Sequence, residues 1–152
     1  MLPGIQLSLR AALSAALSVA LADALRLPFP LYAMIAAVIV TDLSASQTRR
    51  LGFPRLVGTV IGGALGATLS AWLGSGPAAV AVGIAVAMTL SYALHIPVAA
   101  RLAGYVCAIV LLERQDAPWS YALARLIETM LGVSCSMFVG CIPKLLRADH
   151  AA

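Results

Sequence analysis

Apolar residues run almost without interruption along this chain, and charges or Pro/Gly breakers divide them into segments of helical length. Reading the runs between these interruptions predicts six helices. They cover Ile5 to Leu27, Phe29 to Leu43, Phe53 to Leu73, Ala78 to Leu94, Pro97 to Leu112 and Trp119 to Leu146. Proline or glycine stands at most of the joints, where a helix is expected to stop. The pattern therefore predicts an all-α chain with short connections.

The composition indicates that lipid is the solvent of these helices. Hydrophobic residues make up 62% of the 152 residues and charged residues only 11%, against roughly 25% charged residues in soluble domains. The stretch from Leu56 to Ala100 contains no Asp, Glu, Lys or Arg. A spanning helix needs about 20 apolar residues, so the chain has room for about six spans. We therefore predict one polytopic transmembrane domain over residues 1–152, in contact with the bilayer.

The positive charge is distributed as in a membrane protein rather than in a nucleic-acid-binding one. The net charge is +4, but the basic residues lie singly or in pairs between apolar runs, so we exclude nucleic acid as a partner. With a cytoplasmic amino terminus, seven basic residues fall at inner helix ends and three outside. The inner set is Arg10, Arg49, Arg50, Arg55, Arg101, Lys144 and Arg147, and the outer set is Arg26, Arg114 and Arg125. This asymmetry predicts that both termini are cytoplasmic.

A shift of seventy residues aligns the third predicted helix with the sixth. Arg55, Thr59 and Gly62 then match Arg125, Thr129 and Gly132, and the strongest difference is Gly58 against Glu128. Both helices also carry a small residue at every fourth position, which allows two backbones to approach closely. These small residues are Gly62, Gly66 and Ser70 in one helix and Gly132, Ser136 and Gly140 in the other. For either helix alone, the alternative explanation of these small residues is ordinary helix packing in a membrane protein rich in small residues.

The duplication predicts two repeats, about residues 5–73 and 78–146, that enter the membrane in opposite directions. Each repeat has three helices, and an odd number inverts the second copy relative to the first. Many transporters are built in this way. The second helix of each repeat is about 15 residues long, which is short for a span. Paired short segments at matching positions point to a binding site near the middle of the membrane.

Two arginines are the candidate anion ligands. Arg125 follows Trp119 by six residues, which places it about 9 Å deeper than an interfacial tryptophan. A charge at such depth is costly and usually faces a cavity or a partner. Arg55 opens the third helix from the inner side, although it could also reach the interface by snorkelling. Two arginine-bearing helix starts that point inward from opposite faces predict an anion path.

Other polar residues near the arginines have two possible roles each. Thr59 and Thr129 could donate to an anion or bond to their own backbone carbonyl one turn back, and Gly58, Gly62 and Gly132 border the same path. Glu128 could pair with Arg125, three residues away on the same helix, or act as a proton carrier. Asp42 is the second candidate counter-ion or proton site and could pair with Arg49, Arg50 or Arg55. Tyr32 and Tyr105 are interpreted as packing residues rather than ligands.

No constellation in the sequence indicates catalysis or a cofactor. There is no Ser/His/Asp set, phosphate-binding loop or pair of catalytic carboxylates. The three cysteines lie inside apolar runs and have no metal-ligand spacing. We therefore expect neither an enzyme nor a metal or cofactor site.

The ordered motifs of the chain resemble a known membrane family. They are RAAL from Arg10, PFPLY from Pro28, RLVGTVIGGALG from Arg55 and ARLIETMLG from Ala124. Together, from about Ser8 to Leu146, they resemble the membrane domain of the fusaric acid resistance and aromatic acid exporter family. The element Arg-x-x-Gly-Thr-x-x-Gly is also similar to that of the plant aluminium-activated malate transporters, which are dimeric anion channels.

The resemblance implies a function and a location. It implies export of aromatic or other organic carboxylates across the bacterial inner membrane, driven by the proton gradient, with the family's arginines at Arg55 and Arg125. The chain lacks the large soluble domain and second membrane domain of the better-known exporters, so we expect a homodimer. The alternative hypothesis is a non-transporting structural or accessory subunit of a larger membrane complex.

Overall fold

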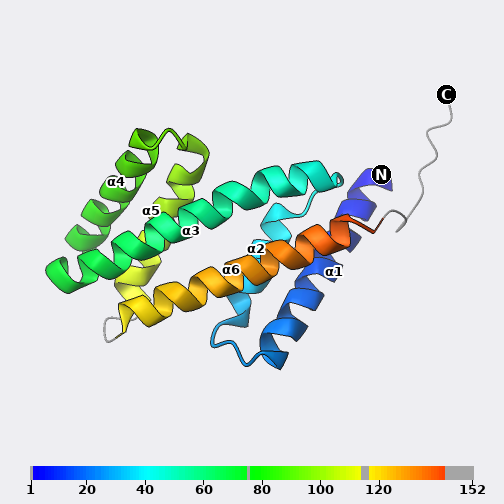
Figure 1. Ribbon diagram of the computed structural model, residues 1–152, viewed down its shortest axis with the longest axis horizontal. Coiled ribbons are helices and arrows are strands. Elements are labelled where there is room, and N and C mark those ends of the chain that lie inside the picture. The colour runs from blue at the N-terminus through cyan, green and yellow to red at the C-terminus, as the bar shows by residue number, and fades with distance from the viewer. Residues whose placement is uncertain (1, 75, 114–116, 143–152) are drawn as a thin grey trace. The chain divides into compact units, whose positions relative to one another are not determined.

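The computed structural model describes residues 2–74, 76–113 and 117–142, and all regular structure within these ranges is helical (Figure 1). The helices are α1 (Leu2–Ala24), α2 (Pro30–Val40), α3 (Ala45–Leu73), α4 (Pro77–Ala93), α5 (Pro97–Glu113) and α6 (Pro118–Gly140). The predicted all-α class and the six helical segments are therefore confirmed. Arg114, Lys144 and Arg147, which entered the predicted charge asymmetry, lie outside the described residues.

Three helices are long and apolar enough to cross a membrane: Gly4–Ala24 in α1, α3 and α6. The 11 residues of α2 extend about 16 Å at 1.5 Å per residue, well short of a hydrocarbon core of about 30 Å. The 17 residues of α5 equal the length of α4. Both α2 and α5 are therefore shorter than the about 20 residues of a complete span, as predicted, although α2 is shorter than its predicted range. Six complete spans stay a prediction.

The start of α3 is the largest error in the predicted boundaries. The helix begins at Ala45 rather than at Phe53 and runs through Pro54. The carboxylate of Asp42 accepts the Ser44 N–H at 3.2 Å, and the Thr48 N–H donates to the Ser44 carbonyl in the first helical turn. This turn starts the helix on polar residues, and a search for apolar runs overlooks such a start.

Arg55 consequently lies well inside a helix. It follows the start of α3 by more than two turns, and Arg125 lies about two turns inside α6. The prediction that Arg55 opens its helix is therefore wrong, whereas Arg125 lies at the predicted depth in its helix. Snorkelling by Arg55 is also wrong, because only 5% of its surface is exposed.

The helices form two compact units, and the first combines residues 1–52 with residues 128–152. In this unit α1 packs along α2, and the buried residues of α1 repeat at every fourth position: Ser14, Ser18 and Ala22. The carboxyl half of α6 also packs on α2. There Gly132 faces Ala33 and Ala36, and the Thr41 and Ser136 hydroxyls are 2.8 Å apart.

The second unit covers residues 53–127. Here α4 and α5 pack along each other (Figure 1). The core contains Ala87, Ala103, Cys107 and Leu111, with Ile61, Leu65 and Leu69 of α3 packed against it. Gly58, Gly62 and Gly66 of α3 face α5 so closely that an added Cβ would collide with it. Small residues therefore let α3 approach α5 as they let α6 approach α2.

Packing contacts in the two units correspond under the predicted shift of seventy residues. In the second unit Gly62 meets Ala103 and Val106, and in the first unit Gly132 meets Ala33 and Ala36. The residue numbers of corresponding positions differ by seventy in each case: 62 and 132, 33 and 103, and 36 and 106. The third helix of each predicted repeat thus packs on the second helix of the other repeat.

The ends of α1 and α4 correspond under a shift of 69 residues. Arg26 and His95 both have a left-handed backbone, with φ of 52° and 59°. Leu27 N donates to Ala22 O at 2.9 Å, and Ile96 N donates to Ser91 O at 3.0 Å. Both helices thus end in the same carboxyl-terminal motif, built without glycine at the left-handed position.

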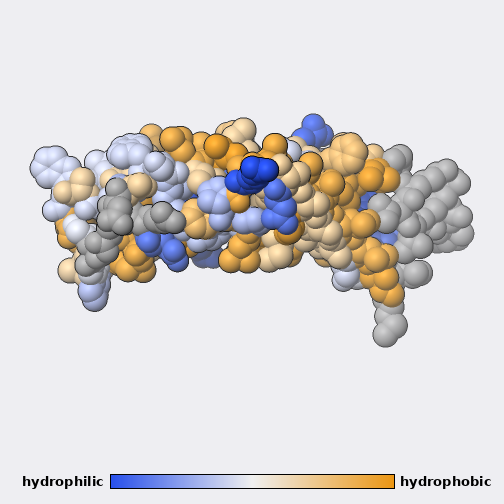
Figure 2. Space-filling model, turned by 90° about the horizontal axis from the view of Figure 1, so that it is seen from below, coloured by the Kyte–Doolittle hydropathy of each residue, from blue (hydrophilic) through white to orange (hydrophobic). Residues whose placement is uncertain are grey.

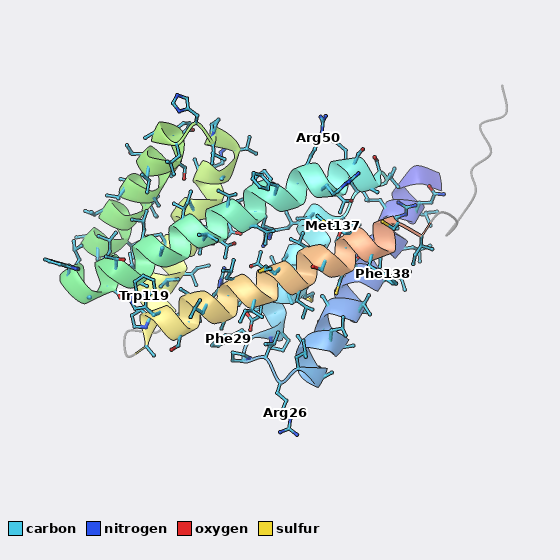
Figure 3. All side chains as sticks on the ribbon, viewed as in Figure 1. Arg26, Phe29, Arg50, Trp119, Met137 and Phe138 are labelled. Carbon is cyan, nitrogen blue, oxygen red and sulfur yellow. The ribbon has the colours of Figure 1, made fainter. Side chains whose placement is uncertain are left out.

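Large apolar side chains are exposed along most of the helices (Figure 2). Trp72 is 82% exposed, Phe138 66% and Trp119 56%. Such a surface suits lipid rather than water. The two tryptophans are free to lie in a membrane interface, whereas Tyr121 is buried. Arg26 and Arg50 point away from the helices (Figure 3).

Candidate functional site

Arg55 belongs to α3 and is buried inside the second unit. Its guanidinium lies within electrostatic reach of Tyr105 in α5 and of Arg125 in α6. Its Nε and Nη1 atoms are buried and have no hydrogen-bond partner among the described residues. A guanidinium has only donors, so these two atoms call for an acceptor.

Arg125 reaches the same region from α6. It is 3% exposed and belongs to the second unit with Arg55. The two arginines interact electrostatically, and their common role in an anion site stays a prediction. Two like charges that are both removed from water favour an anion near them.

The threonines of the predicted site differ in what the structure shows. The Thr59 hydroxyl donates to the Arg55 carbonyl at 2.8 Å, which is the backbone bond considered as the alternative. Its proton is therefore not available to an anion. Thr129 is 3% exposed and lies in the first unit.

The three glycines of the predicted path serve close packing. A Cβ at Gly58 would lie 2.5 Å from Cβ of Leu102 and 3.0 Å from the Ala99 carbonyl oxygen. Gly62 faces the backbone of α5, and Gly132 faces that of α2. These glycines let the helices of each pair approach closely, and their place along an anion path stays a prediction.

Glu128 anchors the start of α2 in the first unit. Its side chain is fully buried, and Oε1 accepts the N–H of Phe29, the residue that caps α2, at 2.7 Å. A carboxylate at this place satisfies an amide that the helix leaves unpaired and opposes the positive end of the helix dipole. This contact is neither of the two predicted roles, so pairing with Arg125 and proton transfer both stay predictions.

Asp42 has a local role. Its carboxylate accepts from Ser44, and its own N–H donates to the Thr48 hydroxyl at 3.1 Å. In the described part of the chain it forms no ion pair with Arg49 or Arg50. Asp42 thus organises the turn into α3.

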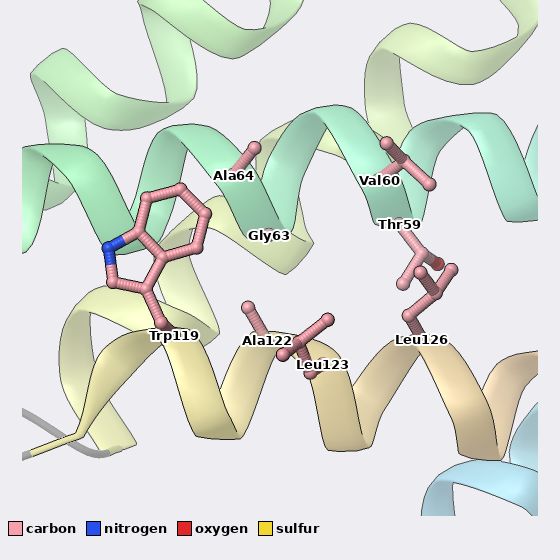
Figure 4. Close-up of a pocket in the computed structure, with 8 residues that line it drawn as sticks. All are labelled: Thr59, Val60, Gly63, Ala64, Trp119, Ala122, Leu123 and Leu126. Atoms are coloured by element: carbon pink, nitrogen blue, oxygen red, sulfur yellow. The ribbon is translucent and has the colours of Figure 1, made fainter.

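A groove lies between α3 and α6 in the second unit (Figure 4). Its volume is about 160 Å³, and its lining is almost entirely apolar: Thr59, Val60, Gly63, Ala64, Trp119, Ala122, Leu123 and Leu126. Trp119 lies at one end, and Thr59 and Leu126 lie at the other. Thr59 follows Arg55 by one helical turn and Leu126 directly follows Arg125, so this end adjoins the arginines along both helices.

Sequence reasoning missed Tyr105 and the groove. Tyr105 was interpreted as a packing residue, and it lies within electrostatic reach of Arg55. No sequence signal pairs α3 with α5, so this contact needed the structure. The groove depends on the crossing of α3 and α6 at Gly63 and Ala122, where a Cβ on Gly63 would lie 3.3 Å from that of Ala122.

These features define a class of protein: an all-helical, multi-pass membrane protein whose second unit buries two arginines. The comparison with family models is consistent with this class. The model described as fusaric acid resistance protein-like matches residues 16–139. The chain therefore belongs to that family, as its motifs predicted, and the family is one of membrane transporters. Searches among curated proteins and among solved structures gave no match.

Proposed function

We propose that the protein transports organic anions, with carboxylates of aromatic acids as its preferred substrates. The observation that carries this proposal is the pair of buried arginines, Arg55 and Arg125, whose charges act on each other. A transported anion would bind between guanidinium groups that are already desolvated. Neither guanidinium then has to lose its water when the anion binds.

The groove supports the aromatic part of the proposal. An apolar cavity of about 150 Å³ is large enough for a benzene ring, and the groove has a volume of about 160 Å³. Its Thr59 and Leu126 end adjoins the arginines in sequence. A ring in the groove and a carboxylate at the arginines would match the two chemical halves of an aromatic acid.

The corresponding contacts of the two units support the proposal of two repeats. Arg55 and Gly62 in α3 are repeated as Arg125 and Gly132 in α6, and the helix pairs that bury these glycines correspond as well. In the proposal the repeats have opposite orientations in a bacterial inner membrane, with both termini cytoplasmic. A homodimer and six spans belong to the same proposal.

Flux measurements on purified protein in liposomes test the function. We expect benzoate uptake into proteoliposomes to exceed that into protein-free liposomes at least about tenfold, and neutral benzamide uptake to stay at the background level. An imposed pH gradient of either sign tests coupling to protons. Equal benzoate uptake with and without protein, in liposomes shown to contain folded protein, would contradict transport and favour an accessory subunit.

The contact of Glu128 predicts a graded loss of stability. Glu128→Ala removes the acceptor of the partly buried Phe29 N–H, and a buried unsatisfied group costs about 1–3 kcal/mol. We expect Glu128→Gln, which keeps a carbonyl oxygen, to lose less than half as much. Denaturant unfolding in detergent measures both. Glu113→Ala is the control because Glu113 is exposed at the end of α5, and equal losses for Ala and Gln at position 128 would contradict the capping role.

A further inference from the structure

We infer that one end of the first unit binds the headgroups of anionic phospholipids. Three arginines, which we call the basic end, form this surface: Arg10, Arg49 and Arg50. Arg49 and Arg50 are exposed in the second turn of α3, and Arg10 is partly exposed in α1. All three belong to the first unit. They lie apart from the two buried arginines in the sequence, so lipid binding here does not depend on the proposed transport.

Hydrogen bonds gather the basic end around the turn between α2 and α3. Arg10 Nη1 donates to the Leu43 carbonyl oxygen at 2.7 Å, which ties α1 to this turn. The Asp42 N–H donates to the Thr48 hydroxyl at 3.1 Å, which ties the turn to the first residues of α3. Thr48 is buried and directly precedes Arg49. The arginines of both helices therefore border the same turn.

Positive charge is in excess at the basic end. Asp42 is the only acidic residue between positions 24 and 112 of the sequence, and its carboxylate accepts the Ser44 N–H at 3.2 Å. Within the described ranges none of the three arginines forms an ion pair, and Arg50 points away from the helices (Figure 3). Three guanidinium groups beside one carboxylate attract an anion, and the fork of a guanidinium matches the oxygens of a phosphate.

Exposed apolar side chains adjoin the arginines and favour a lipid as the source of the anion. Leu9 and Leu13 flank Arg10 in α1 and are exposed. Leu51, which is also exposed, directly follows Arg50. An arginine between lipid-facing residues keeps its charged group at the level of the headgroups. A phospholipid offers a phosphate to the guanidinium groups and acyl chains to the leucines, whereas a soluble phosphate offers only the first.

Retention of added lipid by the full chain in detergent micelles tests the inference, with native mass spectrometry as the measurement. We expect wild type to retain phosphatidylglycerol at least about fivefold over zwitterionic phosphatidylcholine. An arginine near an anionic lipid surface contributes about fivefold to binding. The double variant Arg49→Gln/Arg50→Gln should therefore lower the affinity for phosphatidylglycerol about tenfold or more, and Arg49→Lys/Arg50→Lys, which keeps the charge, should retain most of it.

Arg26→Gln is the matched control. Arg26 is an exposed arginine of the same unit, just beyond the opposite end of α1, and its replacement should leave phosphatidylglycerol retention at the wild-type level. Far-UV circular dichroism checks that each variant stays helical. Should the double Gln variant lose helicity, Arg50→Gln alone decides, with an expected loss of about fivefold.

Several outcomes would overturn the inference. Equal retention of the two lipids by wild type would mean that the basic end does not select a charged headgroup. Unchanged phosphatidylglycerol retention in the Gln variants, or an equal loss in Arg26→Gln, would place lipid selection elsewhere on the protein. Displacement of phosphatidylglycerol by inorganic phosphate at constant ionic strength would make a soluble anion the ligand of this surface.

Discussion

Benzoate flux is expected to fall at least about 100-fold when Arg55 and Arg125 are both replaced by glutamine. Each guanidinium offers charged hydrogen bonds worth about 1.5–3 kcal/mol to an anion, and two of them correspond to a factor of about 100 or more. Glutamine has a similar length and keeps donors, but it removes the charge that attracts the anion into a site away from water.

The single substitutions refine this prediction. Because the two charges act on each other, the effects of Arg55→Gln and Arg125→Gln should not add. Each single variant should lose most of the flux, since an anion held by two guanidinium groups loses affinity when either is absent. Arg101→Gln is the control, as Arg101 is an exposed arginine of α5 in the same unit.

Stability separates a transport role of these arginines from a structural one. Removal of one of two buried like charges relieves their repulsion, so we expect the unfolding midpoint of Arg55→Gln in detergent to equal or exceed that of wild type. Wild-type flux in the double variant would exclude both arginines as anion ligands. A strong loss of stability without a loss of flux per folded molecule would make them structural residues.

Apolar patterning predicted the six helices because each has enough buried or lipid-facing residues to form an uninterrupted run. It missed the part of a helix that carries charged residues. Arg49 and Arg50 are helical and exposed, so they extend α3 away from its apolar part, and a boundary placed by hydrophobicity excluded them. Helix ends defined by polar turns, such as the one at Asp42 and Ser44, follow hydrogen bonds that hydropathy does not report.

The candidate site was predicted in part, and the reason lies in the kind of information that each residue carries. Arg55 and Arg125 stand out in the sequence because a charge in an apolar run is costly. Gly58, Gly62 and Gly132 stand out equally, but spacing alone does not tell a helix contact from a ligand path. Tyr105 is not distinguished by the sequence, since its nearness to Arg55 comes only from the packing of α5 against α3.

Alanine at Gly132 or Gly62 is expected to lower the free energy of unfolding by about 2–3 kcal/mol, the range of overpacking in a close-packed interior. A methyl at position 132 would meet the Ala33 carbonyl of α2, and a methyl at position 62 would meet the Ala103 carbonyl of α5. Backbone cannot rotate out of the way as a long side chain can, so each helix pair must separate. Denaturant or thermal unfolding in detergent measures the loss.

Gly140→Ala provides the control on the same helix as Gly132. Its nearest neighbour would be the Cα atom of Ala45 at 3.8 Å, an ordinary contact, and alanine is favoured over glycine in a helix by about 1 kcal/mol. This variant should therefore equal or exceed wild type in stability. Similar losses at positions 62 and 132 would support repeated helix pairs, because glycines seventy residues apart would then act through the same kind of contact. A loss at only one of them would mean that the other pair relaxes at little cost, and a loss at neither would contradict the close approach of both.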